Sequence, residues 1–368
     1  MGVESRKLQN VVLEMCEYFK EREELVKLLI LAVLSKQHVY ILGPPGTAKS
    51  AIARAIASHF DAKYFEWLVT RFTAPEELFG PIDLTALEKG EYKRITANKL
   101  PEAEIAFVDE IFKANSAILN SLLSVINERI YHDGGIVKVP LNTLIAASNE
   151  LPEDEKELAA LYDRLLIRYV VEYIKNDGNF EEMLKKNDEY TPKTRITKDE
   201  LKIMQEHVAK VDISPILPII VELRRNFREN GIIVSDRRFK QAIAVVKAHA
   251  FFHVRSVATT DDLRVLQYIM WDSPEQVRIV RSVIMDVVDP FARKVMEYRD
   301  IINDYTSKLQ SKIDPAEVQE IMAKLKVIEN EIKELSKMAL SSGKDTAELD
   351  EILDEIQSLK VSMLDKMF

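Results

Sequence analysis

Short apolar runs alternate with amphipathic segments over the first half of the chain. The runs that we expect to form strands cover residues 39–42, 64–69, 105–110, 143–149 and 167–173. Amphipathic helices are expected at 21–34 and 50–60, and after 110, where Ile118, Leu119, Leu122, Leu123 and Ile126 share one face. This alternation predicts an α/β fold with a parallel five-stranded sheet between helices. Ligands of such sheets bind at the carboxyl ends of the strands.

The second half of the chain has a helical pattern. Residues 176–195 are polar and predict a linker with about one helical turn. Helices expected at 199–209, 215–230, 236–250 and 260–271 form a small all-α lid domain over 196–273. The predicted domains are therefore 1–175, 176–195, 196–273 and a last part over 274–368.

Apolar residues in the last part recur in steps of three and four. The three series are Phe291, Val295, Tyr298, Ile302, Tyr305 and Leu309; Val318, Ile321, Leu325, Ile328, Ile332 and Leu335; and Leu349, Ile352, Ile356, Leu359 and Met363. Asp314 and Pro315 predict a helix start, 341–345 predicts a turn, and Pro290 should kink or break the entering helix. We expect a triple-helical coiled coil. The alternative is further helical packing on the second domain.

Composition narrows the class of protein. The 368 residues carry a formal net charge of -9, so a protein that coats nucleic acid is not expected. Cys16 is the sole cysteine, no secretory signal begins the chain, and the longest apolar run, 28–34, is too short to span a membrane. These features predict a cytoplasmic protein without a membrane span.

The stretch ILGPPGTAKS at 41–50 resembles a phosphate-binding loop. Two glycines let successive amides face phosphate oxygens, Lys49 would reach the β- and γ-phosphates, and the Ser50 hydroxyl would bind Mg²⁺. The expected nucleotide-binding residues are Gly43, Pro44, Pro45, Gly46, Thr47, Ala48, Lys49, Ser50 and Asp109. Ala48 replaces the usual glycine. Helix-like dihedrals there would tolerate the methyl group, whereas a positive φ would cost about 1 kcal/mol or more.

Acids and an amide end two later strands. Asp109 and Glu110 close an apolar run, where we expect Asp109 to hold Mg²⁺ through water and Glu110 to polarise the attacking water. Asn149 ends the next strand and could position that water without adding charge. Two arginines, Arg164 and Arg237, are candidate donors to a transferring phosphoryl group, and Arg238 competes for the role of Arg237.

Taken together, these motifs resemble an AAA+ ATPase of the MoxR branch, and within it the RavA-type proteins. The resemblance rests on GPPGTAKS, on TRFTAPEELFGPI at 70–82, and on the stretches at 100–129, 146–169 and 235–242. It implies that Asp109 and Glu110 are Walker B, Asn149 is sensor 1, Arg164 is an arginine finger and Arg237 is sensor 2. Alanine before the lysine is ordinary in that family, which favours the tolerant interpretation of Ala48.

The resemblance also implies an insert at 71–99 and a hairpin at 130–140, whose turn suits Gly134 and Gly135. It further implies ATP and Mg²⁺, a homo-hexameric ring with Arg164 acting in trans, a von Willebrand A-domain partner, and remodelling or maturation of protein clients. The chain departs from RavA-type proteins at its C-terminus, where the inserted β-rich domain is absent. The alternatives are a nucleic-acid motor or loader, and an ATP-gated scaffold with little turnover.

Overall fold

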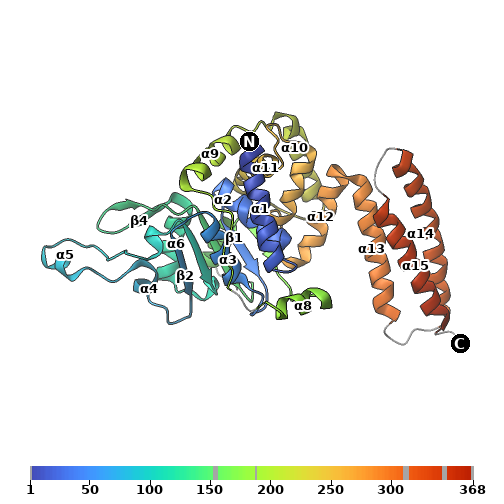
Figure 1. The fold of residues 1–368 in the computed structure, drawn as a ribbon, viewed down its shortest axis with the longest axis horizontal. Helices are drawn as coiled ribbons and strands as arrows, with labels where there is room; N and C mark the ends of the chain where they lie inside the picture. Colours follow the sequence, from blue (N-terminus) through green and yellow to red (C-terminus); the bar gives the residue numbers. More distant parts are fainter. Residues whose placement is uncertain (1, 152–155, 187–188, 310–314, 342–345, 366–368) are drawn as a thin grey trace. The chain divides into compact units, whose positions relative to one another are not determined.

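The computed structural model describes residues 2–151, 156–186, 189–309, 315–341 and 346–365. These residues form two compact units, Met1–Ile284 and Met285–Phe368. The first unit holds the strands of the sheet and every motif discussed above. The second unit is helical (Figure 1). Each unit is described below by itself.

A parallel five-stranded sheet forms the centre of the first unit, as the apolar runs predict. Its strands are β1 (Val39–Leu42), β2 (Tyr64–Leu68), β3 (Ile105–Asp109), β6 (Thr143–Ser148) and β7 (Ile167–Val170). Their order in the sheet is β2-β3-β6-β1-β7. Because β3, β6 and β1 are neighbours, the segments that follow them begin at one edge of the sheet.

Helices cover both faces of this sheet (Figure 1). The helices α6 (Ser116–Glu128) and α7 (Lys156–Arg164) share a core with Tyr40, Ala106 and Leu144 of the strands. On the other face lie α2 (Glu23–Ser35) and α3 (Lys49–His59). The expectation that α2 is amphipathic is wrong, because ten of its thirteen residues are buried. Its outer side is covered by α1 (Gly2–Tyr18), a helix that the sequence pattern did not predict.

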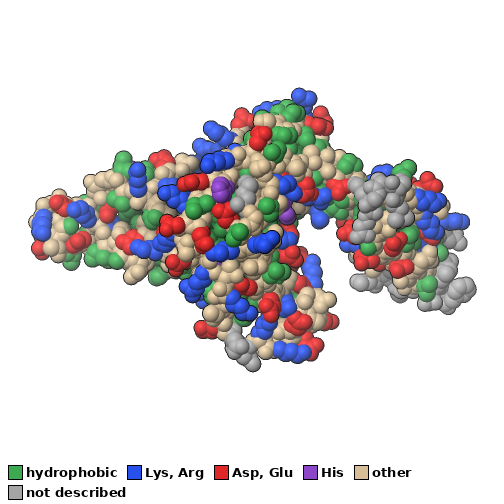
Figure 2. All heavy atoms as spheres, turned by 45° about the horizontal axis from the view of Figure 1, so that its top comes forward, with side chains coloured by type: hydrophobic (Ala, Val, Ile, Leu, Met, Phe, Trp, Pro, Cys, Tyr) green, Lys and Arg blue, Asp and Glu red, His purple; other side chains and the backbone are tan. Residues whose placement is uncertain are grey.

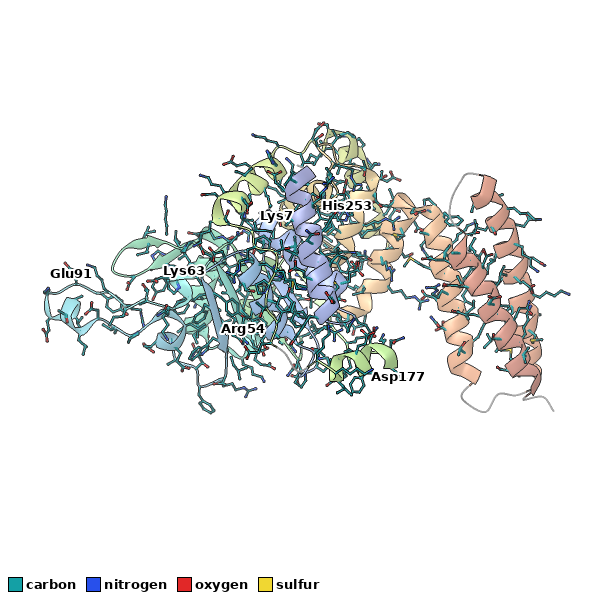
Figure 3. The ribbon with its side chains drawn as sticks, viewed as in Figure 1. Lys7, Arg54, Lys63, Glu91, Asp177 and His253 are labelled. Carbon is teal, nitrogen blue, oxygen red and sulfur yellow. The ribbon has the colours of Figure 1, made fainter. Side chains whose placement is uncertain are left out.

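An insert and a hairpin pack together at one side of the sheet. The insert contains α4 (Pro75–Phe79) and α5 (Leu84–Glu88), and the antiparallel hairpin is β4 (Ile130–His132) with β5 (Ile136–Lys138). The Arg94 amide donates to Asp133 Oδ2 at 3.1 Å, which ties the two together. Gly134 has a φ of 64°, and a Cβ there would collide with the Tyr92 carbonyl. Glu91 lies at the tip of the insert, away from the sheet (Figure 3).

The predicted linker is more ordered than expected. It contains α8 (Asp177–Leu184), an eight-residue helix where the sequence suggested about one turn. Glu14 of α1 accepts hydrogen bonds from the Lys193 and Thr194 amides, both at 3.0 Å, and so holds the end of the linker against α1. This long-range contact explains why local composition underestimated the order.

Helices of the lid follow the linker. They are α9 (Lys198–Ala209), α10 (Leu217–Glu229), α11 (Asp236–Phe252), the 3₁₀ segment η4 (Thr260–Tyr268) and α12 (Pro274–Val288), with a short 3₁₀ turn, η3 (Ser214–Ile216), before α10. The expected helix at 260–271 is therefore a shorter 3₁₀ segment. The first compact unit ends within α12, at Ile284, while the sequence placed the start of the last part at 274.

Three long helices build the second unit: α13 (Pro290–Leu309), α14 (Pro315–Ser341) and α15 (Ala347–Asp365). Pro290 separates α12 from α13, as predicted. The predicted apolar series form one core, including Tyr298, Leu325 and Ile356, except for Leu309, whose side chain lies outside what the structure describes. Asp314 and the turn at 342–345 lie outside the described residues, and coiled-coil supercoiling stays a prediction. Among the described helices, none has the length and apolar character needed to cross a membrane.

Candidate nucleotide site

The loop after β1 is fixed by contacts with β6 and with the chain that follows β7. The Gly43 amide donates to the Ser148 carbonyl at 3.1 Å, which links the loop to β6. A Cβ at Gly43 would collide with the Val171 carbonyl, so only glycine fits where the chain after β7 passes the loop. Gly46 has a φ of 80°, with open space around its Cα. The first glycine therefore serves close packing, and the second serves the turn itself.

Lys49 begins α3 and points back into the loop. Its Nζ donates to the Gly43 carbonyl at 2.7 Å and the Pro44 carbonyl at 3.0 Å, with a longer contact of 3.4 Å to Asn149 Oδ1. Burial lowers the pKa of Lys49, and the charges of Asp109 and Glu110 oppose that shift. A buried ammonium with only carbonyl and amide oxygens as direct partners is suited to exchange them for phosphate oxygens.

The sequence left open whether Ala48 has helix-like dihedrals or a positive φ, and the structure answers this. Its φ of 64° and ψ of 23° place it in the left-handed region. The tolerant interpretation, with helix-like dihedrals, is therefore wrong. For an alanine this conformation costs roughly 1–2 kcal/mol. The loop accepts that strain because the turn must deliver Lys49 into the first turn of α3.

The acids at the end of β3 differ in their surroundings. Burial raises the pKa of Asp109, while Lys49 and the Glu110 amide, which donates to Asp109 Oδ1 at 3.1 Å, oppose the shift. Glu110 is also left-handed, with a φ of 54°. Its carboxylate pairs with Lys113 Nζ at 3.2 Å. A strained backbone at a carboxylate is typical of functional sites.

The donors near Lys49 fit a magnesium ion. Asp109 is a partly buried carboxylate whose charge is incompletely compensated, and Ser50 supplies a hydroxyl in the first turn of α3. Hard oxygen donors of this kind, completed by water and phosphate, are what Mg²⁺ prefers. Asn149 follows β6, the strand between β3 and β1, and its contact with Lys49 brings it to the same place.

Arg164 lies toward the amino ends of the strands, opposite the carboxyl ends where Lys49 lies. It ends α7, which leads into β7, and Ile167 of β7 pairs with Val39 at the start of β1. The start of β1 is roughly 10 Å from its end, where the phosphate loop begins. Arg164 Nη1 donates to the Ala160 carbonyl at 2.6 Å, and none of the described residues accepts a hydrogen bond from its buried Nε.

Arg237 lies on the same side of the first unit as Arg164, because Arg238 next to it contacts Asp163, which immediately precedes Arg164. Burial lowers the pKa of Arg164, and the nearby positive charge of Arg237 lowers it further. Arg237 is exposed, whereas its competitor Arg238 is buried and contacts Asp163 at 2.7 Å and Asp272 at 2.8 Å. Arg238 is therefore engaged inside the molecule, and Arg237 is the arginine of the pair that can reach outward.

Sequence reasoning missed an apolar cavity beside the phosphate loop. It has a volume of about 430 Å³, and its walls include Tyr18, Phe19, Tyr173 and Phe180 together with Gly46 to Ala48. The Tyr173 hydroxyl donates to the Pro45 carbonyl at 3.2 Å, which joins this wall to the loop. Aromatic residues flanking the first helix and the last strand were the available signal.

One further residue, Arg22, and one further cavity complete the surroundings. Arg22 is buried at the start of α2, and its Nη2 donates to the Glu172 carbonyl at 2.8 Å while its Nε contacts the Thr47 carbonyl at 3.4 Å. The phosphate loop is thus supported by α2 as well as β7. A larger cavity, of about 770 Å³, lies between α2, α11, η4 and α12, and no residue of the loop lines it.

A phosphate loop after β1, acids after β3 and an amide after β6, on a sheet of order β2-β3-β6-β1-β7, define an AAA+ ATPase fold. Residues 6–212 match the family described as the MoxR domain in the MoxR-vWA-beta-propeller ternary systems, and residues 215–284 match an AAA lid domain. The chain therefore belongs to the MoxR family of AAA+ ATPases.

Two relatives from Methanocaldococcus jannaschii cover nearly the whole chain. Uncharacterized protein MJ0079 is 42% identical over 360 residues, covering 95% of this chain and 94% of the relative. Uncharacterized protein MJ0812 is 40% identical over 365 residues, covering 96% and 97%. A solved structure from Cytophaga hutchinsonii, named as a candidate ATPase, shares the fold with a TM-score of 0.64 and 19% identity, covering 78% of this chain and 96% of that chain.

Proposed function

We propose that this protein is a Mg²⁺-dependent ATPase that assembles into a ring, most simply a hexamer, with ATP bound between subunits. One observation carries the proposal. Lys49, Asp109 and Asn149 meet at the carboxyl ends of the strands, whereas Arg164 and Arg237 lie toward the amino ends. A site with a phosphate loop but without its arginines is completed when a second copy presents them.

Each candidate residue around the phosphate loop has a defined role in this proposal. Lys49 leaves the Gly43 and Pro44 carbonyls and contacts the β- and γ-phosphates. Glu110 polarises the attacking water, and Asn149 holds that water without adding negative charge near the phosphate. Ser50 and Asp109 would hold Mg²⁺, which would supply positive charge to the phosphates. The aromatic cavity beside Gly46 accepts the adenine ring by stacking.

The neighbouring subunit supplies the cations that stabilise the transition state. Burial and the charge of Arg237 both lower the Arg164 pKa, and the neighbours Asp163 and Arg238 are in contact at 2.7 Å, so one docking event would deliver both arginines. This extends the sensor-2 role expected for Arg237, because the arginine would act on the neighbour's nucleotide rather than on its own. A cationic donor delivered in this way is worth roughly 10³–10⁵ in rate in related phosphoryl transfers.

Three variants separate nucleotide binding, ATP hydrolysis and the contribution of the neighbouring subunit's arginine. Lys49→Ala should lose nucleotide binding, Glu110→Gln should bind ATP without turning it over, and Arg164→Ala should bind ATP while turnover falls roughly 10³–10⁵-fold. Nucleotide titration, phosphate release and light scattering measure these properties. Arg228→Ala, a change at an exposed lid arginine, serves as the matched control and should keep wild-type turnover. Full activity of Arg164→Ala would remove the finger from the proposal.

We further propose a von Willebrand A-domain partner, because the matched family is described by its MoxR-vWA-beta-propeller ternary systems. The work done by the ring is remodelling or maturation of a protein client in the cytoplasm, as in the RavA-type proteins that the sequence resembles. A pull-down with Glu110→Gln, which holds ATP and its contacts, tests both statements. Recovery of neither a von Willebrand A-domain protein nor a client would contradict them.

Two other functions are distinguishable in the same experiments. A nucleic-acid motor would show ATPase activity stimulated by DNA or RNA and salt-sensitive binding. Acidic and basic side chains are interspersed over the face shown in Figure 2, which gives no support to that function. An ATP-gated scaffold would bind ATP with negligible phosphate release.

A further inference from the structure

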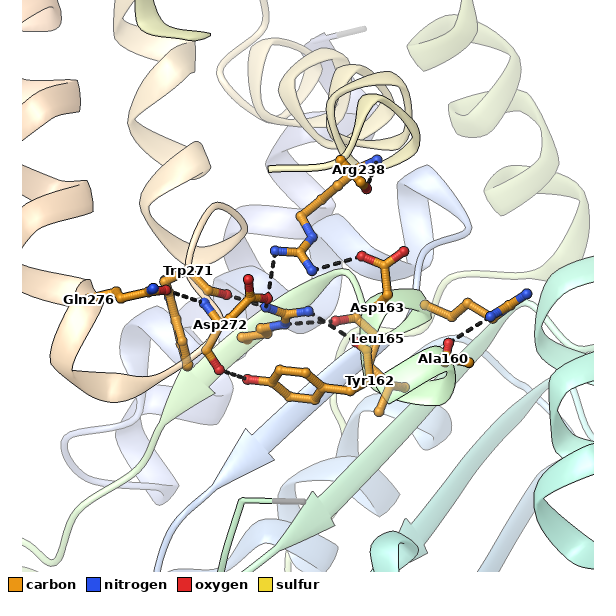
Figure 4. A network of polar contacts seen from close by, with 11 residues as sticks. Ala160, Tyr162, Asp163, Leu165, Arg238, Trp271, Asp272 and Gln276 are labelled. Atoms are coloured by element: carbon orange, nitrogen blue, oxygen red, sulfur yellow. Dashed lines mark hydrogen bonds and ion pairs between the residues drawn. The ribbon is translucent and has the colours of Figure 1, made fainter. Parts of the chain in front are cut away.

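A network of ion pairs joins the buried Arg238 to Asp163 and Asp272 (Figure 4). Asp163 immediately precedes Arg164, and Arg238 immediately follows Arg237. Arg238 Nη2 donates to Asp163 Oδ1 at 2.7 Å, which joins the end of α7 to the first turn of α11. The two outward arginines are therefore clamped through their sequence neighbours, one from each side of the core–lid junction.

The same network is anchored to the sheet. Asp272 Oδ1 contacts Arg238 Nη1 at 2.8 Å and Arg168 Nη1 at 2.7 Å. Arg168 belongs to β7 and is fully buried, with its guanidinium 3.9 Å from the Tyr162 ring centroid. Burial would raise the pKa of Asp272, but Arg238 and Arg168 outweigh it and hold that pKa below its ordinary value.

Backbone contacts make the anchor rigid. Arg168 donates to the Tyr162 carbonyl at 3.0 Å and to the Trp271 carbonyl, and the Tyr162 hydroxyl donates to the Asp272 carbonyl at 2.7 Å. The segment 271–272 between η4 and α12 is thus fixed to α7 and β7. Arg168 and Arg238 are both buried, so removing a carboxylate partner would leave an uncompensated positive charge inside the molecule.

We propose that Asp163 and Arg238 are positioning residues that hold Arg164 and Arg237 together as one two-arginine unit for the neighbouring subunit's nucleotide. This inference rests on the proposed function. The clamp keeps the end of α7 and the start of α11 at a fixed separation, against the mutual repulsion of two guanidinium groups. The junction of α7 and α11 then presents both cations together, and neither enters the neighbour's site alone. A misplacement of about 1 Å can cost on the order of 100-fold in rate.

The first test is Asp163→Asn, which keeps the size of the side chain and removes its charge. We expect kcat to fall on the order of 10–100-fold while KM for ATP and nucleotide affinity change less than about twofold, because the variant's own phosphate loop is intact. Asp236→Asn is the matched control. Asp236 also precedes an arginine and pairs with Arg224 at 2.8 Å, but it is exposed, so kcat should stay at the wild-type value.

A double-mutant cycle shows whether Asp163 acts through Arg164. In the Arg164→Ala background, measured by single-turnover phosphate release, Asp163→Asn should cause a clearly smaller loss than in the wild type, because only Arg237 remains to be misplaced. An equal further loss in that background would overturn the positioning role. If instead Arg164→Ala alone is fully active, the finger is removed from the proposed function and the positioning role fails with it, so the two outcomes are distinguishable.

Mixed rings separate positioning from a folding defect. Asp163→Asn subunits keep an intact phosphate loop, and Lys49→Ala subunits keep intact arginines. Mixing the two should restore turnover above the sum of the separate variants. Light scattering confirms that mixed rings form. Mixed rings that form without any gain in turnover would contradict the proposal.

Discussion

At the scale of single residues, the site contains two left-handed backbone positions that glycine does not occupy. They are Ala48 in the phosphate loop, with a φ of 64°, and Glu110 after β3, with a φ of 54°. Such positions persist when the surrounding structure over-determines them. At Ala48 the surroundings are the Gly43 contact with β6 and the start of α3. At Glu110 they are the end of β3 and the 3₁₀ turn η2 (Ile111–Lys113).

Ala48→Gly should stabilise the protein. Removing the methyl group from a left-handed position relieves about 1 kcal/mol, seen as a higher midpoint of thermal unfolding without nucleotide. Nucleotide affinity should change only modestly, because the loop amides keep their directions. Ala51→Gly, two residues into the helix α3, is the control and should destabilise by about 1 kcal/mol. A fall in the midpoint for Ala48→Gly would show that the position is unstrained.

At the scale of elements, the phosphate loop is a junction of β1, β7 and α2 as much as a local turn. The chain after β7 passes so close that a Cβ at Gly43 would meet the Val171 carbonyl, and Arg22 at the start of α2 reaches the Thr47 carbonyl. The two glycines of the loop therefore have different physical reasons to be there. One is set by a neighbouring element, and the other by the loop's own dihedrals.

A pair of glycine variants tests this difference. Gly43→Ala should lose nucleotide binding and unfold at a clearly lower temperature, because the backbone of Val171 cannot yield as a flexible side chain would. Gly46→Ala meets no atom within 4 Å and should cost only about 1 kcal/mol of strain at its φ of 80°. Equal losses for the two variants, measured by thermal unfolding and nucleotide titration, would contradict this account.

At the scale of the whole molecule, the chain divides into two units with separate cores. The core of the sheet draws on β1, β3, β6, α6 and α7, while the three-helix core draws only on α13, α14 and α15. Pro290, which lies inside the second unit, separates α12 from α13, since proline cannot donate the backbone hydrogen bond that a continuous helix needs. The nucleotide site lies entirely in the first unit.

A chain ending at residue 289 should therefore fold and bind nucleotide as the full chain does. We expect nucleotide affinity to change less than about threefold, since no residue of the site belongs to the three-helix core. Circular dichroism and nucleotide titration measure the two properties. Aggregation of this fragment, while the full chain is soluble, would show that the first unit needs the three-helix core for its stability.

Much of this architecture could be inferred from local pattern. Buried parallel strands form continuous apolar runs, so β1, β3 and β6 and the polar residues that follow them were all predictable. The three-helix core was predictable for the same reason, because its apolar steps repeat along each helix. Lys49, Asp109 and Asn149 could be expected to meet, since parallel neighbours end at one edge.

The remaining features of the site depend on contacts between segments that are distant in the sequence. The left-handed φ of Ala48 depends on how β1, β6 and α3 constrain the loop, which no local propensity reveals. Arg238 is buried because Asp163 and Asp272 come to it from other elements, and that leaves Arg237 as the exposed arginine. The placement of Arg164 away from its own phosphate loop follows from the pairing of β7 with β1. Burial and charge pairing act through space, and adjacent arginines in one sequence stretch therefore acquire different roles.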